Sequence, residues 1–205
     1  MQVLLTNPEI DELTYYLHAW TKRLLKLNKN QNNRIYHLER FKVTRRRFEG
    51  LLKKKEIDLL LLCGHGEEDK IEGEEEIILD KENVYLLEGK TVHALSCQSA
   101  KKLGPLAKAN GAKAYIGYKE DFIVFMDNRN RTSKPFDDEI AALFLDSAFT
   151  ALELLLKQEE PEEVFAKTKE AYDKNIQKAL NSDIQSDADQ FIGWLYWDRD
   201  NLELC

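Results

Sequence analysis

An uninterrupted apolar run, Leu59–Cys63, ends at a polar turn, Gly64-His65-Gly66. The run is far shorter than the ~20 residues that a membrane-spanning helix needs. It is typical of a strand buried on both faces, and such strands occur in parallel sheets that carry helices on either side. We therefore predict a central strand over 57–63 and expect the residues after it to lie at an edge of the sheet.

Strand-like and helix-like segments alternate along the chain, without an internal repeat. Such alternation predicts an α/β fold whose mostly parallel central sheet has helices on both faces. A length of 205 residues is ordinary for one domain, so we expect a single domain over 1–205. The other predicted strands are 2–6, 35–38, 91–96 and 114–117, with hairpin edges at 75–79 and 84–87; the predicted helices are 9–27, 100–110, 137–157 and 161–181, with a basic helix after Thr44; polar loops are expected at 28–33 and 128–135, and an alternating pattern at 191–204.

Charge is distributed unevenly along the chain. The whole chain has a net charge of −7, yet basic residues outnumber acidic ones in the first 60 positions. In the basic helix, Phe48, Leu51 and Leu52 have the i, i+3, i+4 spacing of an amphipathic helix with a solvated outer face. No aromatic residues interleave with the basic ones, as they do in many nucleic-acid-binding surfaces. We therefore do not expect direct binding of nucleic acid.

The cysteines and the N-terminal sequence indicate the cellular compartment of the protein. The three cysteines form no closely spaced framework, which is typical of a reducing compartment. No basic stretch followed by an apolar core marks a signal peptide at the N-terminus. We therefore expect a cytoplasmic protein that does not contact membranes. Zinc-site spacings are absent, and the acidic run at 72–76 lacks the alternating ligands of a calcium loop, so neither a metal nor a cofactor is expected.

A histidine and a cysteine follow two of the predicted strands. His65 comes after the strand at 57–63, and Cys97 comes after the strand at 91–96. Because the carboxyl ends of neighbouring parallel strands open into one crevice, we expect these side chains to lie close together. An imidazole that accepts the thiol proton makes a cysteine a stronger nucleophile. The pair therefore predicts nucleophilic catalysis, with Cys97 attacking and His65 acting as the base.

Backbone groups near this pair fit the same chemistry. The N–H groups of Gly66 and Cys97 are candidates for an oxyanion hole, where each donor contributes about 3 kcal/mol. Cys97 also precedes the helix predicted at 100–110, whose positive N-terminal end would favour a thiolate. Each feature has a simpler structural explanation, because cysteines at strand ends are often small buried apolar residues. Cys63 is assigned to the core, and His93 is expected to pack or hydrogen-bond within its strand.

These strand ends resemble the caspase-fold cysteine peptidases (clan CD), in particular the bacterial and archaeal CHAT type. The resemblance is carried by the strand that enters 64–66, by 95–100 and by 110–117, and it extends over about 57–121. It implies a three-layer caspase-like fold and an intracellular endopeptidase that hydrolyses protein or peptide substrates without a cofactor. It also implies a signalling or antiviral-defence module, and the short chain leads us to expect activation by a partner protein.

The sequence departs from the animal caspases. Their Q-A-C-[RQG]-G signature, with a histidine ~50 residues upstream, is not met, since His65 and Cys97 are closer together. Leu95 stands where many family members have a polar or acidic residue, which argues against specificity for aspartate. Specificity for a basic residue requires an acid in the substrate pocket. The candidates are Glu120 and Asp121, and also Glu67, Glu68 and Asp69, all equally compatible with ordinary surface charge.

Two other classes of function stay open. The first is a caspase-fold interaction module in which the dyad does not turn over substrate. The second is an α/β protein that binds a nucleotide or second messenger in the crevice at the strand ends. Resistance of Cys97 to thiol reagents would favour the first, and a rise in thermal stability with nucleotides would favour the second.

Overall fold

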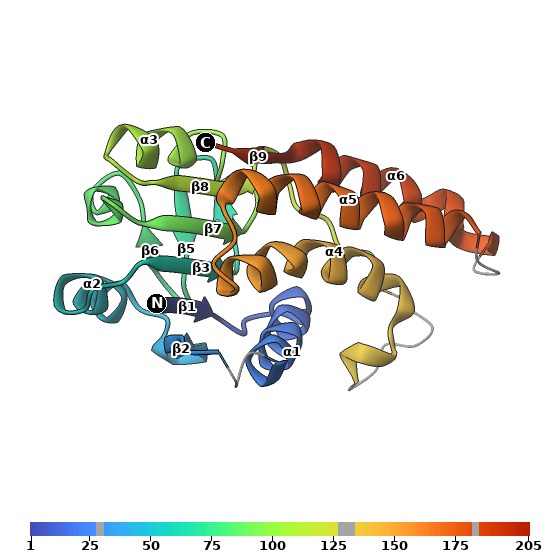
Figure 1. The fold of residues 1–205 in the computed structure, drawn as a ribbon. Coiled ribbons are helices and arrows are strands. Elements are labelled where there is room, and N and C mark those ends of the chain that lie inside the picture. Colours follow the sequence, from blue (N-terminus) through green and yellow to red (C-terminus); the bar gives the residue numbers. More distant parts are fainter. Residues whose placement is uncertain (28–30, 127–133, 182–184) are drawn as a thin grey trace.

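The computed structural model describes residues 1–27, 31–126, 134–181 and 185–205. Its centre is a six-stranded sheet with the order β2-β1-β3-β7-β8-β9 (Figure 1). The first five strands are parallel, and only β9 runs antiparallel to its neighbour β8. The predicted mostly parallel α/β fold is therefore confirmed. The strands are β1 (Gln2–Asn7), β2 (Arg34–Glu39), β3 (Leu59–Cys63), β7 (Thr91–Leu95), β8 (Ala114–Tyr118) and β9 (Leu202–Leu204).

Two separate cores cover the two faces of this sheet, as three layers require. In β3, Leu61 and Cys63 belong to one core, whereas Leu60 and Leu62 belong to the other. All residues of β3 are buried, which explains its unbroken apolar sequence. The first core contains residues of α1 (Glu12–Leu27), α4 (Glu139–Leu156), α5 (Pro161–Leu180) and α6 (Gln185–Asn201); the second contains residues of α2 (Arg45–Lys54) and α3 (Leu103–Ala109).

The chain order reverses within the sheet between β1 and β3. From β1 the chain crosses to β2 on one side, and it then returns to β3 on the other side of β1. In open α/β sheets, ligands bind outside the carboxyl ends of the strands at such a reversal. The segments that follow β1, β3 and β7 all leave the sheet at this carboxyl edge, which makes it the place to look for a functional site.

Most predicted elements form within a few residues of their expected positions. Asp11 caps α1, because its Oδ1 accepts the Thr14 N–H at 2.9 Å, so α1 begins at Glu12 and not at 9. Thr44 caps α2 through the N–H of Arg47. The loop residues predicted at 28–30 and 128–133 lie outside the described part of the chain.

Two segments differ from their predicted structure. Residues 84–87 form a 3-10 helix, η2 (Val84–Leu87), because Asn83 turns the chain by donating its amide to the Ile78 carbonyl. The strand β6 (Ile77–Leu79) pairs with β5 (Lys70–Glu72), which also pairs with β4 (Gly66–Glu67), in a small antiparallel sheet. The alternating pattern at 191–204 is helical through Asn201, and only its last residues form a strand, β9.

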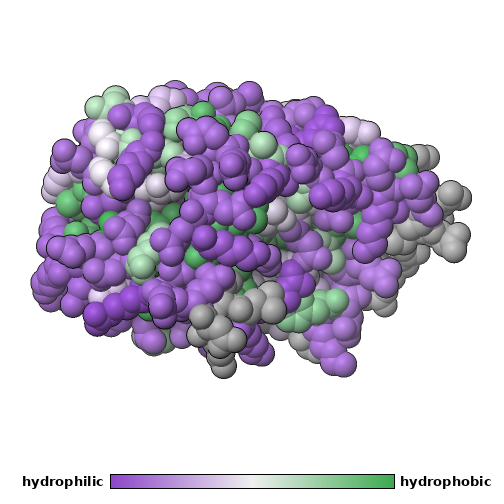
Figure 2. Space-filling model, in the orientation of Figure 1, coloured by the Kyte–Doolittle hydropathy of each residue, from purple (hydrophilic) through white to green (hydrophobic). Residues whose placement is uncertain are grey.

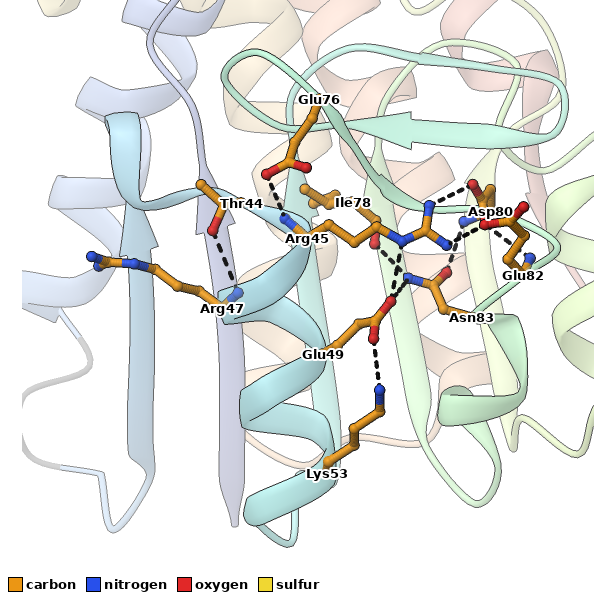
Figure 3. Close-up of polar contacts among 10 residues, drawn as sticks. All are labelled: Thr44, Arg45, Arg47, Glu49, Lys53, Glu76, Ile78, Asp80, Glu82 and Asn83. Carbon is orange, nitrogen blue, oxygen red and sulfur yellow. Dashed lines mark hydrogen bonds and ion pairs between the residues drawn. The ribbon is translucent and has the colours of Figure 1, made fainter.

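A network of charged groups attaches α2 to the segment after β6 (Figure 3). The Arg45 guanidinium donates to both carboxylate oxygens of Asp80, at 2.7 and 3.0 Å, and also to Glu49 and Glu82. The Asn83 amide donates to Glu49 as well as to Ile78. Each carboxylate in the network therefore has a cation or an N–H donor facing it.

The surface is consistent with the polar composition. Figure 2 shows a face that is mostly hydrophilic, with apolar residues in small separate groups. Among the described residues, no helix is both long and apolar enough to cross a membrane. Cys63, Cys97 and Cys205 are free thiols.

Candidate active site

The turn after β3 brings His65 to the carboxyl edge of the sheet. Gly64 has a φ of +146°, and a Cβ there would lie 2.8 Å from Pro8 Cγ, so only glycine fits this position without a shift. Beyond this turn the His65 imidazole is partly exposed, and its Nε2 lies 2.8 Å from Asp11 Oδ2. The histidine is thus oriented by a carboxylate that lies 54 residues earlier in the chain.

Asp11 has two contacts that hold it in place. One carboxylate oxygen caps α1 through Thr14, while the other faces His65. Partial burial alone would raise the pKa of Asp11, but hydrogen bonds from Thr14 and the nearby His65 lower it overall. An ionised, helix-anchored carboxylate can fix the orientation of an imidazole and stabilise its protonated form. No local pattern in the sequence signals this contact between Asp11 and His65.

Cys97 lies on the turn after β7, with its side chain partly buried. Its Sγ donates a weak hydrogen bond to the Phe122 carbonyl, at 3.8 Å. Burial raises the pKa of the Cys97 thiol, the Asp121 and Asp198 carboxylates raise it further, and the bond to Phe122 opposes them only in part. The thiol is therefore held protonated in this arrangement.

The predicted helix after Cys97 starts later than expected. Residues 99–102 form turns, and α3 begins at Leu103. The influence of a helix N-terminus on charge falls off within its first turn. The expected stabilisation of a Cys97 thiolate by this helix is therefore wrong, because the turn separates the sulfur from the helix end.

The structure places the histidine and cysteine turns against each other. The Gly64 N–H donates to the Leu95 carbonyl at 3.3 Å, and a Cβ on Gly66 would lie 3.1 Å from the Cys97 carbonyl oxygen. Within the described residues, no hydrogen bond joins the His65 imidazole to Cys97 Sγ: His65 Nε2 contacts Asp11, and Cys97 Sγ donates to the Phe122 carbonyl. Gly66 and Cys97, the predicted oxyanion donors, thus occupy touching turns, and their role stays a prediction.

Acidic residues lie on both sides of the Cys97 turn. The Gln98 N–H donates to the Glu120 carbonyl at 3.1 Å, and the Gln98 side chain donates to Asp121 Oδ1 at 2.8 Å. Across the turn, Glu68 pairs with Lys101 and Lys102, which lower its pKa to about 2. Glu67, Glu68, Asp69, Gln98 and Lys102 line an open hollow of about 460 Å³.

Helix α6 supplies a buried carboxylic acid that the sequence analysis does not identify. Asp198 Oδ1 accepts the Ile123 N–H at 3.0 Å, while Oδ2 is buried and has no hydrogen-bond partner among the described residues. Burial raises the pKa of Asp198 well above its usual value. The neighbouring Trp197 donates to the Asp121 carbonyl at 2.9 Å. Helix α6 therefore holds the 121–123 segment, whose Phe122 carbonyl in turn accepts from Cys97.

Other titratable groups near these strands belong to the core. Cys63 is buried, as predicted, and burial raises the pKa of its thiol to about 12. His93 is also buried, and burial lowers its pKa to about 3. Neither ring nitrogen of His93 has a hydrogen-bond partner within the described residues, so this histidine packs in its strand without a polar contact.

Comparison with known proteins identifies the fold. No protein family and no curated protein matches the sequence. Among solved structures, the chain is similar to the complex of the Porphyromonas gingivalis RgpB pro- and mature domains, with a TM-score of 0.61 and 11% sequence identity. The similarity covers 99% of this chain and 46% of that one, which is a cysteine peptidase of the caspase fold. The chain has a caspase-like fold.

The caspase-like fold gives the strand-end residues their context. At 11% identity the likeness concerns the fold, and it spans less than half of the RgpB chain. Any chemistry of this chain therefore depends on its own side chains at the carboxyl edge of the sheet. Among the residues that the structure describes, no three His, Cys, Asp or Glu side chains form a group that could hold a metal ion.

Proposed function

We propose that the chain is a cysteine endopeptidase with Cys97 as the nucleophile, His65 as the general base and Asp11 as the residue that orients His65. The observation that carries the proposal is the 2.8 Å contact between His65 Nε2 and Asp11 Oδ2, at the turn that touches the Cys97 turn. A nucleophile, a base and an oriented third group form a recurring arrangement of acyl-transfer enzymes. The caspase-like fold of the domain supports this assignment.

The reaction follows from these roles. His65 accepts the Cys97 proton, and the thiolate attacks the carbonyl carbon of the scissile peptide bond. The N–H groups of Gly66 and Cys97 stabilise the resulting oxyanion. His65 then protonates the leaving amine as the C–N bond breaks, and a thioester remains on Cys97. Water, deprotonated by His65, hydrolyses the thioester, releases the acid and restores the thiol.

We propose a basic residue before the cleaved bond. The acids at Glu67 and Glu68 are paired with lysines, and Glu120 lies 3.8 Å from Lys101. Asp121 instead contacts the neutral amide of Gln98, beside the Cys97 turn. Asp121 therefore keeps an uncompensated charge, which makes it the acid best suited to a substrate lysine or arginine, with Glu120 next to it.

Activation by a partner protein is part of the proposal. Transfer of the Cys97 proton to His65 is disfavoured while the thiol is bonded to the Phe122 carbonyl and burial raises the pKa of that thiol, so the chain alone has a low basal activity. A partner that shifts the 121–123 segment would release the thiol. We place the enzyme in the CHAT type on the resemblance over 57–121, as a cytoplasmic signalling or antiviral-defence module that needs no cofactor.

A second candidate function is an interaction module with the same fold and no turnover. The bond between Cys97 Sγ and Phe122, together with the missing bond to His65, favours it. In this case Cys97 would stay bonded to the Phe122 carbonyl permanently and would never act as a nucleophile.

Cleavage of a proteome-derived peptide library tests the proposal. New termini would be identified by mass spectrometry for wild type, for Cys97→Ala and for Cys63→Ala as a matched control cysteine. We expect cuts after Lys or Arg with wild type and Cys63→Ala, and none with Cys97→Ala. Cleavage by Cys97→Ala would remove Cys97 as the nucleophile. If the wild type cleaves no peptide and its Cys97 also resists alkylation, the interaction module is favoured.

A further inference from the structure

A pocket separate from the Cys97 turn lies on the same edge of the sheet, beside the ends of β1 and β2. It encloses about 290 Å³ between α1, Glu9, Arg40 and Phe136, and we call it the α1 pocket. Glu9 follows β1 and Arg40 follows β2, so the pocket opens at the carboxyl ends of these strands. Its volume is at the lower end of the range for small-molecule sites, ~300–1,000 Å³.

Helix α1 lines this pocket with basic residues. His18, Lys22 and Lys26 follow each other at intervals of four residues, so they share one face of the helix. Like charges at this spacing repel each other and destabilise a helix. Within the described residues neither lysine forms an ion pair, whereas Arg40 pairs with Glu9 and Arg23 pairs with Asp146. The α1 pocket therefore has two ammonium groups of uncompensated charge.

A buried imidazole lines the α1 pocket with them. His18 is only 3% exposed, and neither of its ring nitrogens has a hydrogen bond within the described residues. Its Nδ1 lies 3.3 Å from Glu9 Oε2, and its Nε2 lies 3.8 Å from Glu39 Oε2, but neither contact has hydrogen-bond geometry. Buried polar groups nearly always have a hydrogen-bond partner. His18 faces two carboxylates without a hydrogen bond to either, beside two lysines that have no ion pair within the described residues.

Aromatic rings form another wall of the α1 pocket. The Phe136 side chain is 48% exposed, although it contacts Trp20 with ring centroids 4.8 Å apart. The Arg23 guanidinium lies 5.4 Å from the centroid of the Phe136 ring. Tyr15 also lines the pocket. Exposed aromatic faces next to cations are suited to stacking with planar rings that carry negative charge elsewhere.

We infer that the α1 pocket binds a small phosphorylated aromatic molecule of mononucleotide size. Its phosphate contacts Lys22 and Lys26, while its ring packs against Phe136. The volume suits a ligand of about this size, and the uncompensated charge favours an anion. This binding does not depend on peptidase activity, because the residues that line the α1 pocket are not those of the proposed catalytic site.

Isothermal titration calorimetry of the full chain tests this inference with AMP and, separately, inorganic phosphate as probes. We expect AMP to bind more tightly than phosphate, and Lys22→Gln/Lys26→Gln to weaken AMP at least tenfold. The matched control is Lys174→Gln/Lys178→Gln, which removes two exposed lysines of the same spacing and the same charge from α5. The control variant should bind AMP as wild type does.

Phe136→Ala distinguishes the contribution of the ligand's ring to binding from that of its phosphate. We expect this variant to weaken AMP binding several-fold and to leave phosphate binding unchanged, and circular dichroism would verify its folding. The inference is wrong if AMP does not bind at millimolar concentration, or if the α5 control weakens AMP as much as the α1 variant does. Equal affinities for AMP and phosphate, unaffected by Phe136→Ala, would also contradict it, because the site would then recognise an anion without an aromatic ring.

Discussion

Polar groups are hydrogen-bonded in the network around Arg45, whereas several near Cys97 are buried without a partner among the described residues. Around Arg45, the carboxylates of Asp80 and Glu49 both receive charged hydrogen bonds (Figure 3). Around Cys97, Ser96 Oγ and Asp198 Oδ2 are buried, and neither has a hydrogen-bond partner within the described residues. Pairing stabilises a fold, whereas an unpaired buried group costs stability. The comparison indicates that the first region stabilises the fold and that the second lowers its stability.

The contrast extends to pH. Arg45 lowers the pKa of Asp80, so the stability that Asp80 contributes is present at neutral pH and is lost as the pH falls through its folded-state pKa. Burial raises the pKa of Asp198, so its contribution is present in acid and is lost as the pH rises toward its folded-state pKa. The two regions should therefore limit the stability of the protein at opposite ends of the pH range.

The largest expected effect concerns the Asp11–His65 contact. Asp11→Asn should slow hydrolysis of a cleaved peptide about 100-fold, or ~2.7 kcal/mol in transition-state energy, because an amide cannot stabilise a protonated imidazole. Its effect on stability should be small, since asparagine caps helices as well as aspartate does. Steady-state kinetics and urea unfolding would measure both quantities. Unchanged hydrolysis would leave Asp11 as a helix cap only.

Next in size is the loss of the paired network. Arg45→Met should lower the free energy of unfolding by about 2 kcal/mol, because it leaves Asp80 and Glu49 without their shared cation. The variant should also lose less stability than wild type between pH 5 and pH 3, since the pKa of Asp80 would return toward its usual value. Urea unfolding at several pH values would measure this. A stability equal to that of wild type would show that the network contributes little.

A smaller effect of opposite sign is expected at Asp198. Asp198→Asn keeps an oxygen for the Ile123 N–H and removes an acid that burial disfavours in its charged form. We expect the variant to gain about 1 kcal/mol relative to wild type at pH 8, and to lose that advantage at pH 4, where the acid is protonated. A variant less stable than wild type at pH 8 would show that the carboxylate has a partner after all.

The smallest effect is expected at Ser96. Its hydroxyl is buried without a partner, so Ser96→Ala should change the free energy of unfolding by less than about 0.5 kcal/mol. Thermal unfolding would measure the change, with Ser147→Ala as the control, because the Ser147 hydroxyl donates to the Leu143 carbonyl at 2.9 Å. If Ser96→Ala is clearly the more destabilising of the two variants, the contrast between the regions does not hold at this position.

The sequence predicts the fold where local patterns and burial agree. The apolar run of β3 and the spacing of apolar residues along α2 predict these elements correctly, because Phe48, Leu52 and all residues of β3 are buried in the folded protein. The pattern fails at 84–87, where the Asn83 side chain bends an apolar segment into a 3-10 turn. It also fails at the N-terminus of α3, where turns delay the helix predicted after Cys97.

The site is predictable only in part, because its supporting contacts come from distant segments. His65 and Cys97 can be found from the strands that precede them. Asp11 meets His65 across 54 residues, and Asp198 meets Ile123 across 75. Such contacts depend on strand order and helix placement, which no local pattern in the sequence encodes.

Covalent labelling with a peptidyl acyloxymethyl ketone tests the central claim most directly. The probe would carry arginine next to its reactive group, and mass spectrometry would identify the modified cysteine. We predict modification of Cys97, with Cys63 and Cys205 unmodified, and a rate at least 100-fold lower in His65→Gln. Modification of Cys205 in preference to Cys97, or a rate that does not depend on His65, would contradict the assignment of the catalytic site.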